Sequence, residues 1–482
     1  MVENLSLDTI RLASINQLER FSLQLSGLEP LVCEQVLRHL PGKRIVFKAR
    51  WNGSDVLVKL FFNEQDYARE KHGLELLEKY GIPGPARRWV FVGAGADQSD
   101  DAYLIATDFF ADAESLGFRC QAEVDEVSVS QVLAVIGSMH RAGLVQEDIH
   151  LDNFLFSNGQ VYIIDGGSVK GYEKPKHDIW AKNLALFFAQ FPPQFDEKIP
   201  QIFVAYGDPN FWSKKSLKSF LNEVIKKRLW RIRKYQKKSL RSCTEFVADQ
   251  NWGRFLVLRR DRDNSALRKL LDQPDASFGQ GRLIKSGLTA TVYEVAGSGG
   301  ANWVLKRYNI KSWSHGLSRS WRPTRGWTSW RNAHALAIAG VPTPKPVALR
   351  ESRSGPLRRE AYLITEKVEG DVFDQWLLKR PGHDIPSWLD AAILNTFRGL
   401  LGARISHGDM KSTNFIVTKT QLVLVDLDVM CVHSSERAFY RAFRKDMKRF
   451  MANWHGDTHR HFTQLLSPIF EKIGLQSPEL RV

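Results

Sequence analysis

The feature that most constrains the fold is a spacing of three polar residues that occurs twice in the chain. In each copy an Asp is followed by an Asn five residues later and by a second Asp twelve residues after the Asn. The two copies, displaced by 261 residues, are Asp148, Asn153 and Asp165, and Asp409, Asn414 and Asp426. An apolar run typical of a buried hairpin precedes each final Asp. One spacing in one strand context, found twice, indicates an internal duplication.

Further landmarks lie upstream of each copy in a shared order. A strand-like run ends in a lysine, at Lys59 and again at Lys306. A helical pattern follows, over residues 70–80 and 330–339, and each leads into a Gly-x-Pro-x-Pro turn and another strand-like run. The order of strand lysine, helix, turn, strand, Asp-x4-Asn and final Asp is therefore present in both halves.

These residue types suit phosphoryl transfer, which needs positioning and charge neutralisation more than covalent chemistry. A strand lysine can hold the phosphates of ATP, a loop Asp can deprotonate the attacking hydroxyl, and an Asn and a second Asp can hold Mg²⁺. Any one of these Asp or Asn residues alone is more often a turn former or cap. The assignments are catalysis by Asp148 and Asp409, phosphate binding by Lys59 and Lys306, and metal binding by Asn153, Asp165, Asn414 and Asp426.

The duplicated order predicts an α+β chain with two tandem, two-lobed domains of the protein-kinase type. We place the first domain at residues 1–210, a basic helical linker at 211–275 and the second domain at 276–482. The length of 482 residues fits two to three domains, and 28 Phe and 14 Trp supply enough apolar volume for two cores.

The two halves differ in the acid that normally holds the strand lysine. Glu70 lies eleven residues after Lys59 on the predicted helix, where it can pair with the lysine. No Asp or Glu occurs between residues 295 and 350, so Lys306 lacks such a partner on its own helix. That helix offers only uncharged substitutes, Asn332 and His334.

The halves also differ in the loop that would cover a nucleotide. Residues 285–293 of the second half form a candidate phosphate loop around Gly287. The first half has only a short turn at 41–44 with a single glycine. Each half therefore keeps the metal-binding residues and lacks a different accessory part.

The formal charge of +15 is concentrated in one segment. Between residues 214 and 241 there are twelve Lys or Arg residues and one acid, Glu223, with apolar residues at helical spacing. This basic amphipathic helix is either a solvated linker or a surface for a polyanion such as anionic lipid, a phosphorylated glycan or nucleic acid. Nucleic acid is the least favoured partner, because no recognition motif accompanies the charge.

A second basic segment, residues 308–328, follows Lys306. It contains three Trp and four Lys or Arg and no acid, namely Trp313, Trp321, Trp327, Lys311, Arg319, Arg322 and Arg325. It could pack on the domain surface, or it could grip a phosphorylated, lipid-linked glycan.

The sequence favours a cytoplasmic location. Its four cysteines are far apart and form no disulfide or zinc pattern. The N-terminal residues do not form a signal peptide, and no apolar run is long enough to span a bilayer. We expect a cytoplasmic protein, with peripheral attachment to the inner membrane as an option.

The motifs resemble the bacterial lipopolysaccharide core kinases, the heptose and Kdo kinases, which are related to the RIO-like atypical kinases. The residues that carry the resemblance are HGDMKSTNF at 407–415, GVPTP at 340–344 and VLKRYN at 304–309, with weaker counterparts EDIHLDNFL at 147–155 and GIPGP at 81–85. The resemblance implies an ATP- and Mg²⁺-dependent enzyme that phosphorylates a sugar, heptose or Kdo, of lipopolysaccharide core or another lipid-linked glycan. It also implies that the protein acts at the inner membrane, and the basic linker could contact the anionic surface of that membrane.

Two other functions compete with a sugar kinase. One or both halves could be pseudokinases that bind nucleotide without turnover and serve as a scaffold or regulator of envelope biogenesis. The RIO-like motifs also allow a protein Ser/Thr kinase.

Overall fold

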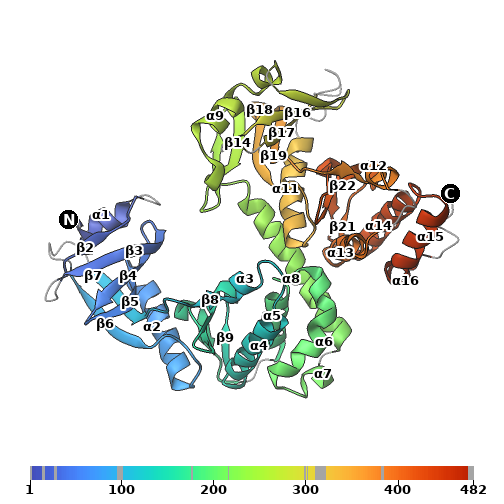
Figure 1. Cartoon of the computed structure of the whole chain (residues 1–482). Coiled ribbons are helices and arrows are strands. Elements are labelled where there is room, and N and C mark those ends of the chain that lie inside the picture. Colours follow the sequence, from blue (N-terminus) through green and yellow to red (C-terminus); the bar gives the residue numbers. More distant parts are fainter. Residues whose placement is uncertain are drawn as a thin grey trace. The chain divides into compact units, whose positions relative to one another are not determined.

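The computed structural model describes residues 3–13, 17–25, 30–94, 101–174, 177–214, 216–279, 281–297, 300, 302–309, 322–380 and 385–475. The chain divides into two compact units (Figure 1). Unit 1 comprises residues 1–190 and 197–221, and unit 2 comprises residues 191–196 and 222–482. Both units mix helices and sheets. The domain boundaries predicted at 210 and 275 stay a prediction.

Unit 1 contains a seven-stranded sheet in the order β1-β2-β3-β4-β5-β7-β6. The strands are β1 (Glu3–Asn4), β2 (Phe21–Leu23), β3 (Leu31–Leu40), β4 (Arg44–Trp51), β5 (Ser54–Phe61), β6 (Arg87–Ala94) and β7 (Asp101–Asp108). Side chains alternate between the two faces of a strand, and Val56, Val58 and Leu60 of β5 therefore point together into one core, which also includes α1 (Leu7–Leu12). Lys59 lies between them in sequence and points to the other face.

Helix α2 (Glu64–Lys79) packs on that other face and brings Glu70 to Lys59. It begins earlier than the helix predicted from residue 70, because the Asn63 side chain accepts a hydrogen bond from the Asp66 N–H and caps the first turn. Tyr67 and Leu74 of α2 pack against Phe61 and Ile105 of the sheet.

The rest of unit 1 is mainly helical and carries the first Asp-x4-Asn loop. Its main helices are α4 (Glu126–Arg141) and α5 (His177–Phe188), with shorter helices α3 (Leu116–Arg119), α6 (Ile199–Ile202) and α7 (Phe211–Lys214). Two small sheets accompany them, formed by β8 (Glu114–Ser115), β10 (Phe154–Ser157) and β11 (Gln160–Ile163), and by β9 (Leu144–Gln146) and β12 (Val169–Gly171). The hairpin predicted between Asn153 and Asp165 is the antiparallel pair β10–β11.

Unit 2 contains a second seven-stranded sheet in the order β13-β14-β18-β19-β17-β16-β15. Its strands are β13 (Phe246–Gln250), β14 (Arg254–Arg259), β15 (Arg282–Ser286), β16 (Ala290–Ala296), β17 (Asn302–Tyr308), β18 (Pro346–Ser354) and β19 (Leu357–Glu366). Lys306 lies on β17, and α11 (Arg325–Ile338) follows it in the chain. Two of these strands, β13 and β14, come from the segment 211–275 that the sequence analysis treated as a helical linker.

Five strands have the same order in both sheets. Strands β3-β4-β5-β7-β6 of unit 1 correspond to β15-β16-β17-β19-β18 of unit 2, with the strand lysine on the central member. The additional strands lie at opposite edges, β1 and β2 beside β3, and β13 and β14 beside β18. The internal repeat therefore covers the sheet framework as well as the polar motif.

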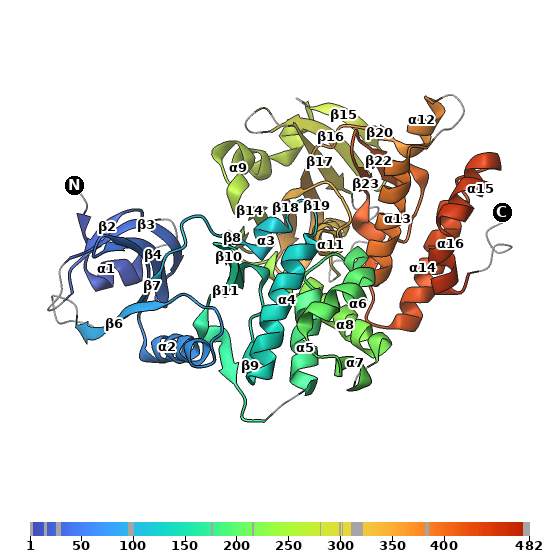
Figure 2. The same ribbon diagram turned by 60° about the horizontal axis from the view of Figure 1, so that its bottom comes forward.

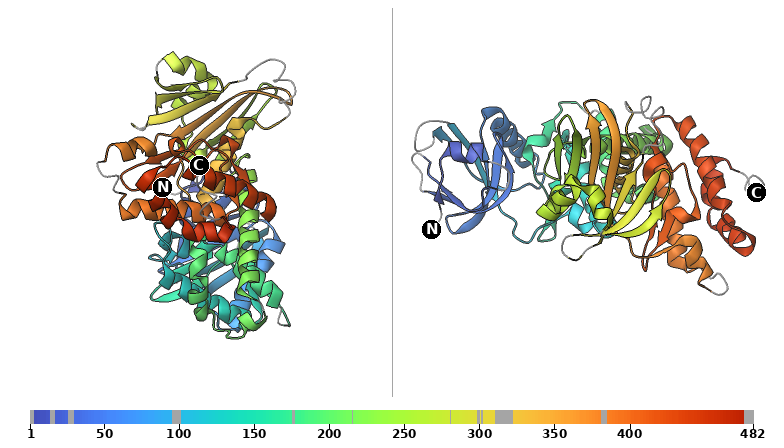
Figure 3. Two further views of the ribbon diagram at one scale, coloured as in Figure 1. Left: turned by 90° about the vertical axis from the view of Figure 1, so that its right-hand side faces the viewer. Right: turned by 90° about the horizontal axis from the view of Figure 1, so that it is seen from above.

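The helical part of unit 2 contains α12 (Phe373–Leu378), α13 (Ser387–Gly402), α14 (Glu436–Met451), α15 (Gly456–Leu465) and α16 (Ser467–Ile473). Figure 3 shows these helices, orange to red, apart from the yellow and orange strands of the sheet, and Figure 2 shows α14 beside α15 and α16. The small sheets are again present, as β20 (Asp371–Val372), β22 (Phe415–Val417) and β23 (Leu422–Leu424), and as β21 (Ile405–Ser406) and β24 (Cys431–Val432).

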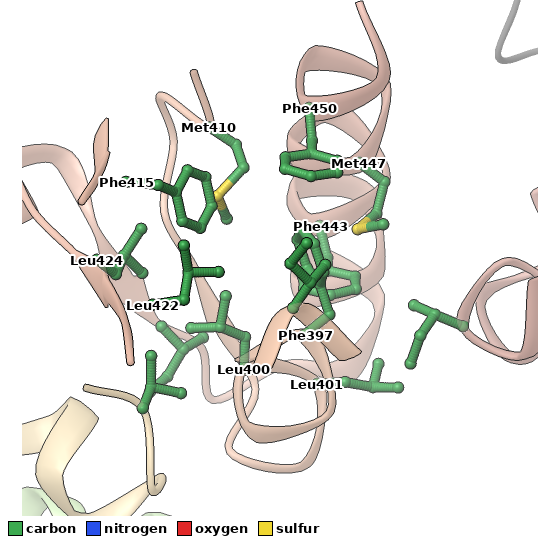
Figure 4. Packing of buried hydrophobic residues seen from close by; sticks show 14 of the residues in the cluster. Phe397, Leu400, Leu401, Met410, Phe415, Leu422, Leu424, Phe443, Met447 and Phe450 are labelled. Carbon is green, nitrogen blue, oxygen red and sulfur yellow. The ribbon is translucent and has the colours of Figure 1, made fainter. Parts of the chain in front are cut away.

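The largest core of unit 2 lies between α13, α14 and the β22–β23 hairpin. Figure 4 shows its side chains, among them Phe397, Leu400, Met410, Phe415, Leu424, Phe443, Met447 and Phe450. Phe450 is fully buried and contacts the rings of Phe397 and Phe415 at centroid distances of 4.9 and 5.7 Å. This core fixes α14 next to the second Asp-x4-Asn loop.

The predicted basic helix is α8 (Leu217–Lys238), and α9 (Ser265–Asp272) follows β14 in the same region. The buried side of α8 carries Val224, Ile232 and Arg228. The Arg228 guanidinium forms two hydrogen bonds with Asp196, at 2.6 and 2.9 Å. All four cysteines are free.

Candidate active sites

In unit 1 the predicted lysine–glutamate pair is formed. Lys59 Nζ lies 2.5 Å from Glu70 Oε1, and Glu70 is 1% exposed. The Gly166 and Gly167 N–H groups donate to the two oxygens of Glu70, at 3.1 and 3.0 Å. Burying a carboxylate is costly unless its oxygens are paired and hydrogen-bonded. Glu70 meets that condition and ties α2, β5 and the turn after Asp165 together.

Asp165 adopts a left-handed backbone conformation, with φ 68° and ψ 66°. This conformation is costly for residues other than Gly, Asn and Asp, and such outliers gather at functional sites. Asp165 lies 4.0 Å from Lys59 Nζ, and the Ser168 hydroxyl donates to its Oδ2 at 2.9 Å. Lys59, Glu70 and Asp165 thus converge as the sequence predicted.

Arg44 is a further cation at this site that the sequence analysis did not identify. It lies at the start of β4, and its Nη1 is 3.8 Å from Asp165 Oδ1. Val46 pairs with Lys59 across β4 and β5, so Arg44, two residues earlier, lies on the same face of the sheet. The carboxylate of Asp165 therefore has two cationic neighbours.

The Asp-x4-Asn loop of unit 1 places Asp148 and Asn153 together. The Asn153 side-chain N–H₂ donates to the backbone carbonyl of Asp148 at 2.8 Å, so its carbonyl oxygen stays available as a ligand. The Asp148 side chain is exposed. His150 is also exposed and accepts a hydrogen bond from the Asp152 N–H, which makes it a local cap.

A network of buried polar side chains packs beneath the surface next to the Asp148–Asn153 loop. The Gln146 side chain donates to the Ile164 carbonyl, and the Asn183 side chain of α5 donates to the Gln146 carbonyl. His140 of α4 joins through Asn183 at 3.2 Å and Tyr206 at 2.9 Å. Burial lowers the pKa of His140 to about 3, so the ring is neutral in the folded protein.

In unit 2 the lysine pairs with the final Asp of the motif. Lys306 Nζ lies 2.6 Å from Asp426 Oδ1, and Asp426 has φ 63° and ψ 61°, as its counterpart in unit 1 has. Burial opposes ionisation of Asp426, but the positive charge of Lys306 outweighs it, helped by Arg325, and the pKa is lowered. The site therefore holds an ionised carboxylate beside an ammonium.

A second buried acid stands beside this pair. The side chain of Asp428 is 3% exposed and forms an ion pair with Arg325, the first residue of α11. Burial and the negative charge of Asp426 raise the pKa of Asp428. Within the described residues, the carboxylate nearest to the strand lysine is therefore Asp426 of the turn in unit 2 and Glu70 of the helix in unit 1.

Neither uncharged substitute on α11 takes the place of the missing helix acid. The Asn332 side chain donates to the backbone carbonyls of Leu427 and Met430, at 2.9 and 2.8 Å. His334 is buried among aromatic rings, with Trp330 at 4.8 Å and Phe246 at 5.1 Å between centroids. Asn332 therefore positions the turn that carries Asp426, and His334 belongs to the core.

In the Asp-x4-Asn loop of unit 2, two cations contact Asp409. Lys411 Nζ lies 3.1 Å from Asp409 Oδ2, and Arg449 Nε of α14 lies 2.9 Å from Oδ1. The Asn414 side chain donates to the Asp409 backbone carbonyl at 2.7 Å, as Asn153 does in unit 1. Asp409 is half-buried, unlike the exposed Asp148.

Asp446 of α14 anchors this loop and was not identified from the sequence. Its two carboxylate oxygens accept hydrogen bonds from the His407 and Gly408 N–H groups, at 2.6 and 2.9 Å. The His407 ring lies 3.0 Å from the Val425 carbonyl, next to Asp426. In unit 1 the nearest equivalent helix residue is Asn183, which contacts a loop carbonyl in place of loop N–H groups.

Gly287 lies in the turn between β15 and β16, as the phosphate-loop assignment expects. Its N–H donates to the Ala290 carbonyl at 3.1 Å, and Leu288 beside it is 90% exposed. Val292 of β16 pairs with Lys306 of β17, so the turn lies near the lysine strand. In unit 1 the corresponding β3–β4 turn occupies residues 41–43.

The second basic segment is only partly described, since residues 310–321 lie outside the described ranges. Of its assigned residues, Arg325 pairs with Asp428, and Trp327 stacks under Arg358 at 4.3 Å and against Phe255 at 4.8 Å. These two residues therefore serve packing within unit 2. Trp313, Trp321, Lys311 and Arg319 are outside the described residues.

The donor set at each site fits a hard divalent cation such as Mg²⁺. The side chains that offer oxygen ligands in or near the Asp-x4-Asn loops are Asn153 and Asp165 in unit 1, and Asn414 and Asp426 in unit 2. Across the described ranges, no group of three or more His, Cys, Asp or Glu gathers as a protein-only metal site.

Residues 280–467 match the sequence model of the lipopolysaccharide kinase (Kdo/WaaP) family. The resemblance that the motifs predicted is confirmed for this region. The matched region contains Lys306, Asp409, Asn414 and Asp426 and covers the larger part of unit 2.

The chain is also similar to a curated kinase of this kind. It is 30% identical over 150 residues to 3-deoxy-D-manno-octulosonic acid kinase from Photobacterium profundum. The match covers 29% of this chain and 60% of that relative, so the chain spans about 60% of the relative's length.

Two solved structures have a weaker likeness. WaaP in complex with acyl carrier protein has a TM-score of 0.30 and 19% identity, over 42% of this chain and 87% of that one. The structure of vaccinia related kinase 3 has a TM-score of 0.24 and 15% identity, over 33% of this chain and 54% of that one. The kinase assignment made from the motifs rests on the family match and the curated relative.

Proposed function

We propose that the chain transfers the γ-phosphate of ATP to a hydroxyl of a lipopolysaccharide inner-core sugar, heptose or Kdo, at the site of unit 2. We also propose that both units are two-lobed kinase-like domains in tandem. The observation that carries the function is that Lys306 pairs with Asp426 inside the region that matches the lipopolysaccharide kinase family. In the same region Asn414 links the backbone of Asp409 to Val425, the residue before Asp426.

The residues of unit 2 suit the roles that phosphoryl transfer needs. Asp409 accepts the proton of the attacking hydroxyl, and Asp446 holds the loop that presents Asp409 by binding two backbone N–H groups. Lys306 balances the charge of the phosphates. Asn414 and Asp426 would hold Mg²⁺, which supplies charge neutralisation on the phosphate oxygens when it is bound.

Unit 1 is better suited to a supporting role, and this is the second candidate function. Its Asp148 is exposed whereas Asp409 is half-buried, and its α5 offers Asn183 where α14 offers Asp446. We propose that unit 1 binds nucleotide with little or no turnover and that unit 2 carries the transfer. In this proposal unit 1 is a pseudokinase and unit 2 is an active kinase.

The test is mass spectrometry of core oligosaccharide from a deletion strain that expresses the wild type, Asp409→Asn or Asp148→Asn. We expect Asp409→Asn to lose the core phosphate and Asp148→Asn to retain it. With purified protein, Asp409→Asn should lower kcat by about a thousandfold, equal to about 4 kcal/mol. Full complementation by both single variants and by the double variant would falsify the sugar-kinase proposal.

A protein Ser/Thr kinase predicts a different result in the same experiment. Phosphate would then appear on protein, including this chain itself, and the core oligosaccharide would be unchanged between strains. Asp409→Asn should abolish that protein label if unit 2 carries the activity.

We further propose that α8 contacts an anionic membrane surface from the cytoplasmic side. Lys226, Lys234 and Lys237 of α8 are exposed, and Trp230 among them is 49% exposed. Lysine clusters with an interfacial aromatic suit the headgroup region of anionic lipid. No helix among the described residues is both long and apolar enough to cross a membrane.

A further inference from the structure

The outer side of α14 carries a row of cations that no part of the proposed mechanism uses. Arg437, Arg441, Lys445 and Lys448 are all exposed. Their spacing of four, four and three residues places them along one face of the helix. None of the four forms an ion pair with any residue in the described ranges.

This row, called here the α14 ridge, leads to the catalytic loop. Arg449 follows Lys448 in the last turn of α14 and lies 2.9 Å from the carboxylate of Asp409. Lys411 contacts the other oxygen of Asp409 at 3.1 Å. The cations therefore continue from the solvent face of α14 to the candidate catalytic Asp.

Contacts on the opposite side of α14 fix the position of this helix. Asp446 binds the N–H groups of His407 and Gly408, and Phe443, Met447 and Phe450 fill the core. Asp446 is buried, and the only other acid of α14, Glu436, pairs with Arg404. The ridge is thus a rigid, positively charged surface with no acid of its own helix to neutralise it.

A row of unpaired cations next to the residue that receives the acceptor hydroxyl suits an acceptor with negative charges of its own. We propose that the α14 ridge, with Lys411 and Arg449, binds anionic groups of the acceptor glycan, phosphate or carboxylate, and so directs its hydroxyl to Asp409. Charge complementarity carries this assignment. It rests on the proposed sugar-kinase function and adds how the acceptor is recognised.

The ridge binds the acceptor and does not touch ATP, so its loss should affect the two substrates differently. In the triple variant Arg441→Gln/Lys445→Gln/Lys448→Gln, the KM for core oligosaccharide should rise about tenfold or more, because each exposed charge contact contributes roughly a two- to fivefold factor. The KM for ATP should stay unchanged. The wild-type KM for the glycan should rise with added salt, and the variant's should rise less.

A matched control neutralises the same residue types elsewhere on unit 2. Arg359, Lys269 and Lys419 are exposed and lie outside the catalytic loop and α14. The variant Arg359→Gln/Lys269→Gln/Lys419→Gln carries the same change in net charge. It should keep the wild-type KM for the glycan, and an equal rise in both variants would show that only net charge matters and would overturn the proposal.

Two treated acceptors distinguish the anionic groups. Core oligosaccharide stripped of phosphate with hydrofluoric acid keeps its carboxylates, and amidated oligosaccharide keeps its phosphates. If phosphate is the group that binds, only the stripped glycan should lose affinity for the wild type and be insensitive to the ridge variant. If carboxylate is the group that binds, only the amidated glycan should lose affinity for the wild type and be insensitive to the ridge variant.

A direct binding measurement separates failure of this inference from failure of the proposed function. Titration calorimetry of the full chain with the untreated core oligosaccharide needs no turnover. Loss of binding in the ridge variant supports the ridge even if no phosphate is transferred. Equal binding of the wild type and the ridge variant overturns the ridge assignment, whether or not transfer occurs.

Discussion

At the scale of single residues, the two sites differ in where the counter-charge of the lysine originates. Glu70 of a helix holds Lys59, whereas Asp426 of a turn holds Lys306. The sequence predicted the first pair from an eleven-residue separation on adjacent elements. It could not predict the ion pair between Asp428 and Arg325, because their contact depends on how α11 meets the turn after β23.

Removing Glu70 should strongly destabilise unit 1. Glu70→Ala leaves Lys59 without its nearest carboxylate and leaves the Gly166 and Gly167 N–H groups unsatisfied. We expect a loss of about 3–5 kcal/mol in the free energy of unfolding of unit 1, measured by chemical denaturation.

The matched control for this variant is Glu78→Ala on the same helix. Glu78 pairs with Arg87, but its side chain is 70% exposed. Its removal should cost about 1 kcal/mol or less. Similar losses in the two variants would contradict the structural role given to Glu70.

His140 gives unit 1 a dependence on pH. Its pKa is about 3 when folded, against an ordinary value of 6.5, because of burial. As the pH falls below 6.5 the unfolded chain takes up a proton that the folded chain does not, so this contribution to stability falls with decreasing pH.

The variant His140→Gln tests this linkage. Between pH 7 and pH 5 the stability advantage of the wild type over the variant should shrink by about 2 kcal/mol. Denaturant unfolding at both pH values measures it. A constant difference between the two proteins would show that His140 is not held neutral.

At the scale of elements, the contact of α2 with the turn after Asp165 depends on glycine. A Cβ on Gly73 would lie 1.8 Å from the Gly166 carbonyl oxygen, a distance that real contacts do not reach. The close approach lets Glu70, one turn earlier, meet the N–H groups of this turn. In unit 2 the helix instead carries Asn332, whose side chain bridges to the turn by hydrogen bonds.

Gly73→Ala should therefore destabilise unit 1 although alanine favours helices. The added methyl group displaces α2 from the turn and separates Glu70 from Lys59, at a cost of about 2 kcal/mol or more. Thermal unfolding measures this loss. His72→Ala, at an exposed position of the same helix, should change stability by about 0.5 kcal/mol or less.

Helix α14 links the core of unit 2 to the Asp-x4-Asn loop. Phe450→Ala removes a fully buried ring between Phe397 and Phe415, and should cost about 3–5 kcal/mol in unfolding free energy. Because Asp446 and Arg449 share this helix, kcat should also fall at temperatures where the variant stays folded. Unchanged kcat in the folded variant would show that the loop does not depend on α14.

The element scale also shows the limit of sequence reasoning. The two Asp-x4-Asn motifs could be recognised because all their residues, with the final Asp, lie within eighteen positions of one another and recur with one spacing. Asp446 follows the loop it anchors by almost forty residues, and no local pattern marks it. Strands β13 and β14 were missed because the predicted helical linker was extended to residue 275, although the basic run that predicted a helix ends at residue 241. The helix itself was predicted correctly as α8.

At the scale of the whole molecule, the excess of positive charge should govern attachment to membranes. We expect the full chain to bind vesicles that contain anionic lipid and not vesicles of neutral phosphatidylcholine. The variant Lys226→Gln/Lys234→Gln/Lys237→Gln should lower the partition coefficient about a hundredfold, because each lysine near the surface contributes roughly 1 kcal/mol. Co-sedimentation measures the bound fraction.

The control for net charge is again Arg359→Gln/Lys269→Gln/Lys419→Gln. It should bind anionic vesicles as the wild type does, if α8 is the contact. A loss of binding that is equal in both triple variants would instead assign attachment to the overall charge of the chain.

The carboxylate that pairs with the strand lysine belongs to a helix in unit 1 and to a turn in unit 2. This difference should allow inhibitors to be selective for one of the two units. Some compounds could bind in the space that opens when the helix after the lysine strand moves outward. Such binding requires that the carboxylate paired with the lysine moves away together with that helix. Unit 1 meets this requirement, since Glu70 travels with α2. In unit 2 the partner remains on the turn when α11 moves, and Asn332 tethers α11 to that turn. Such compounds should therefore discriminate between the candidate sites of the two units.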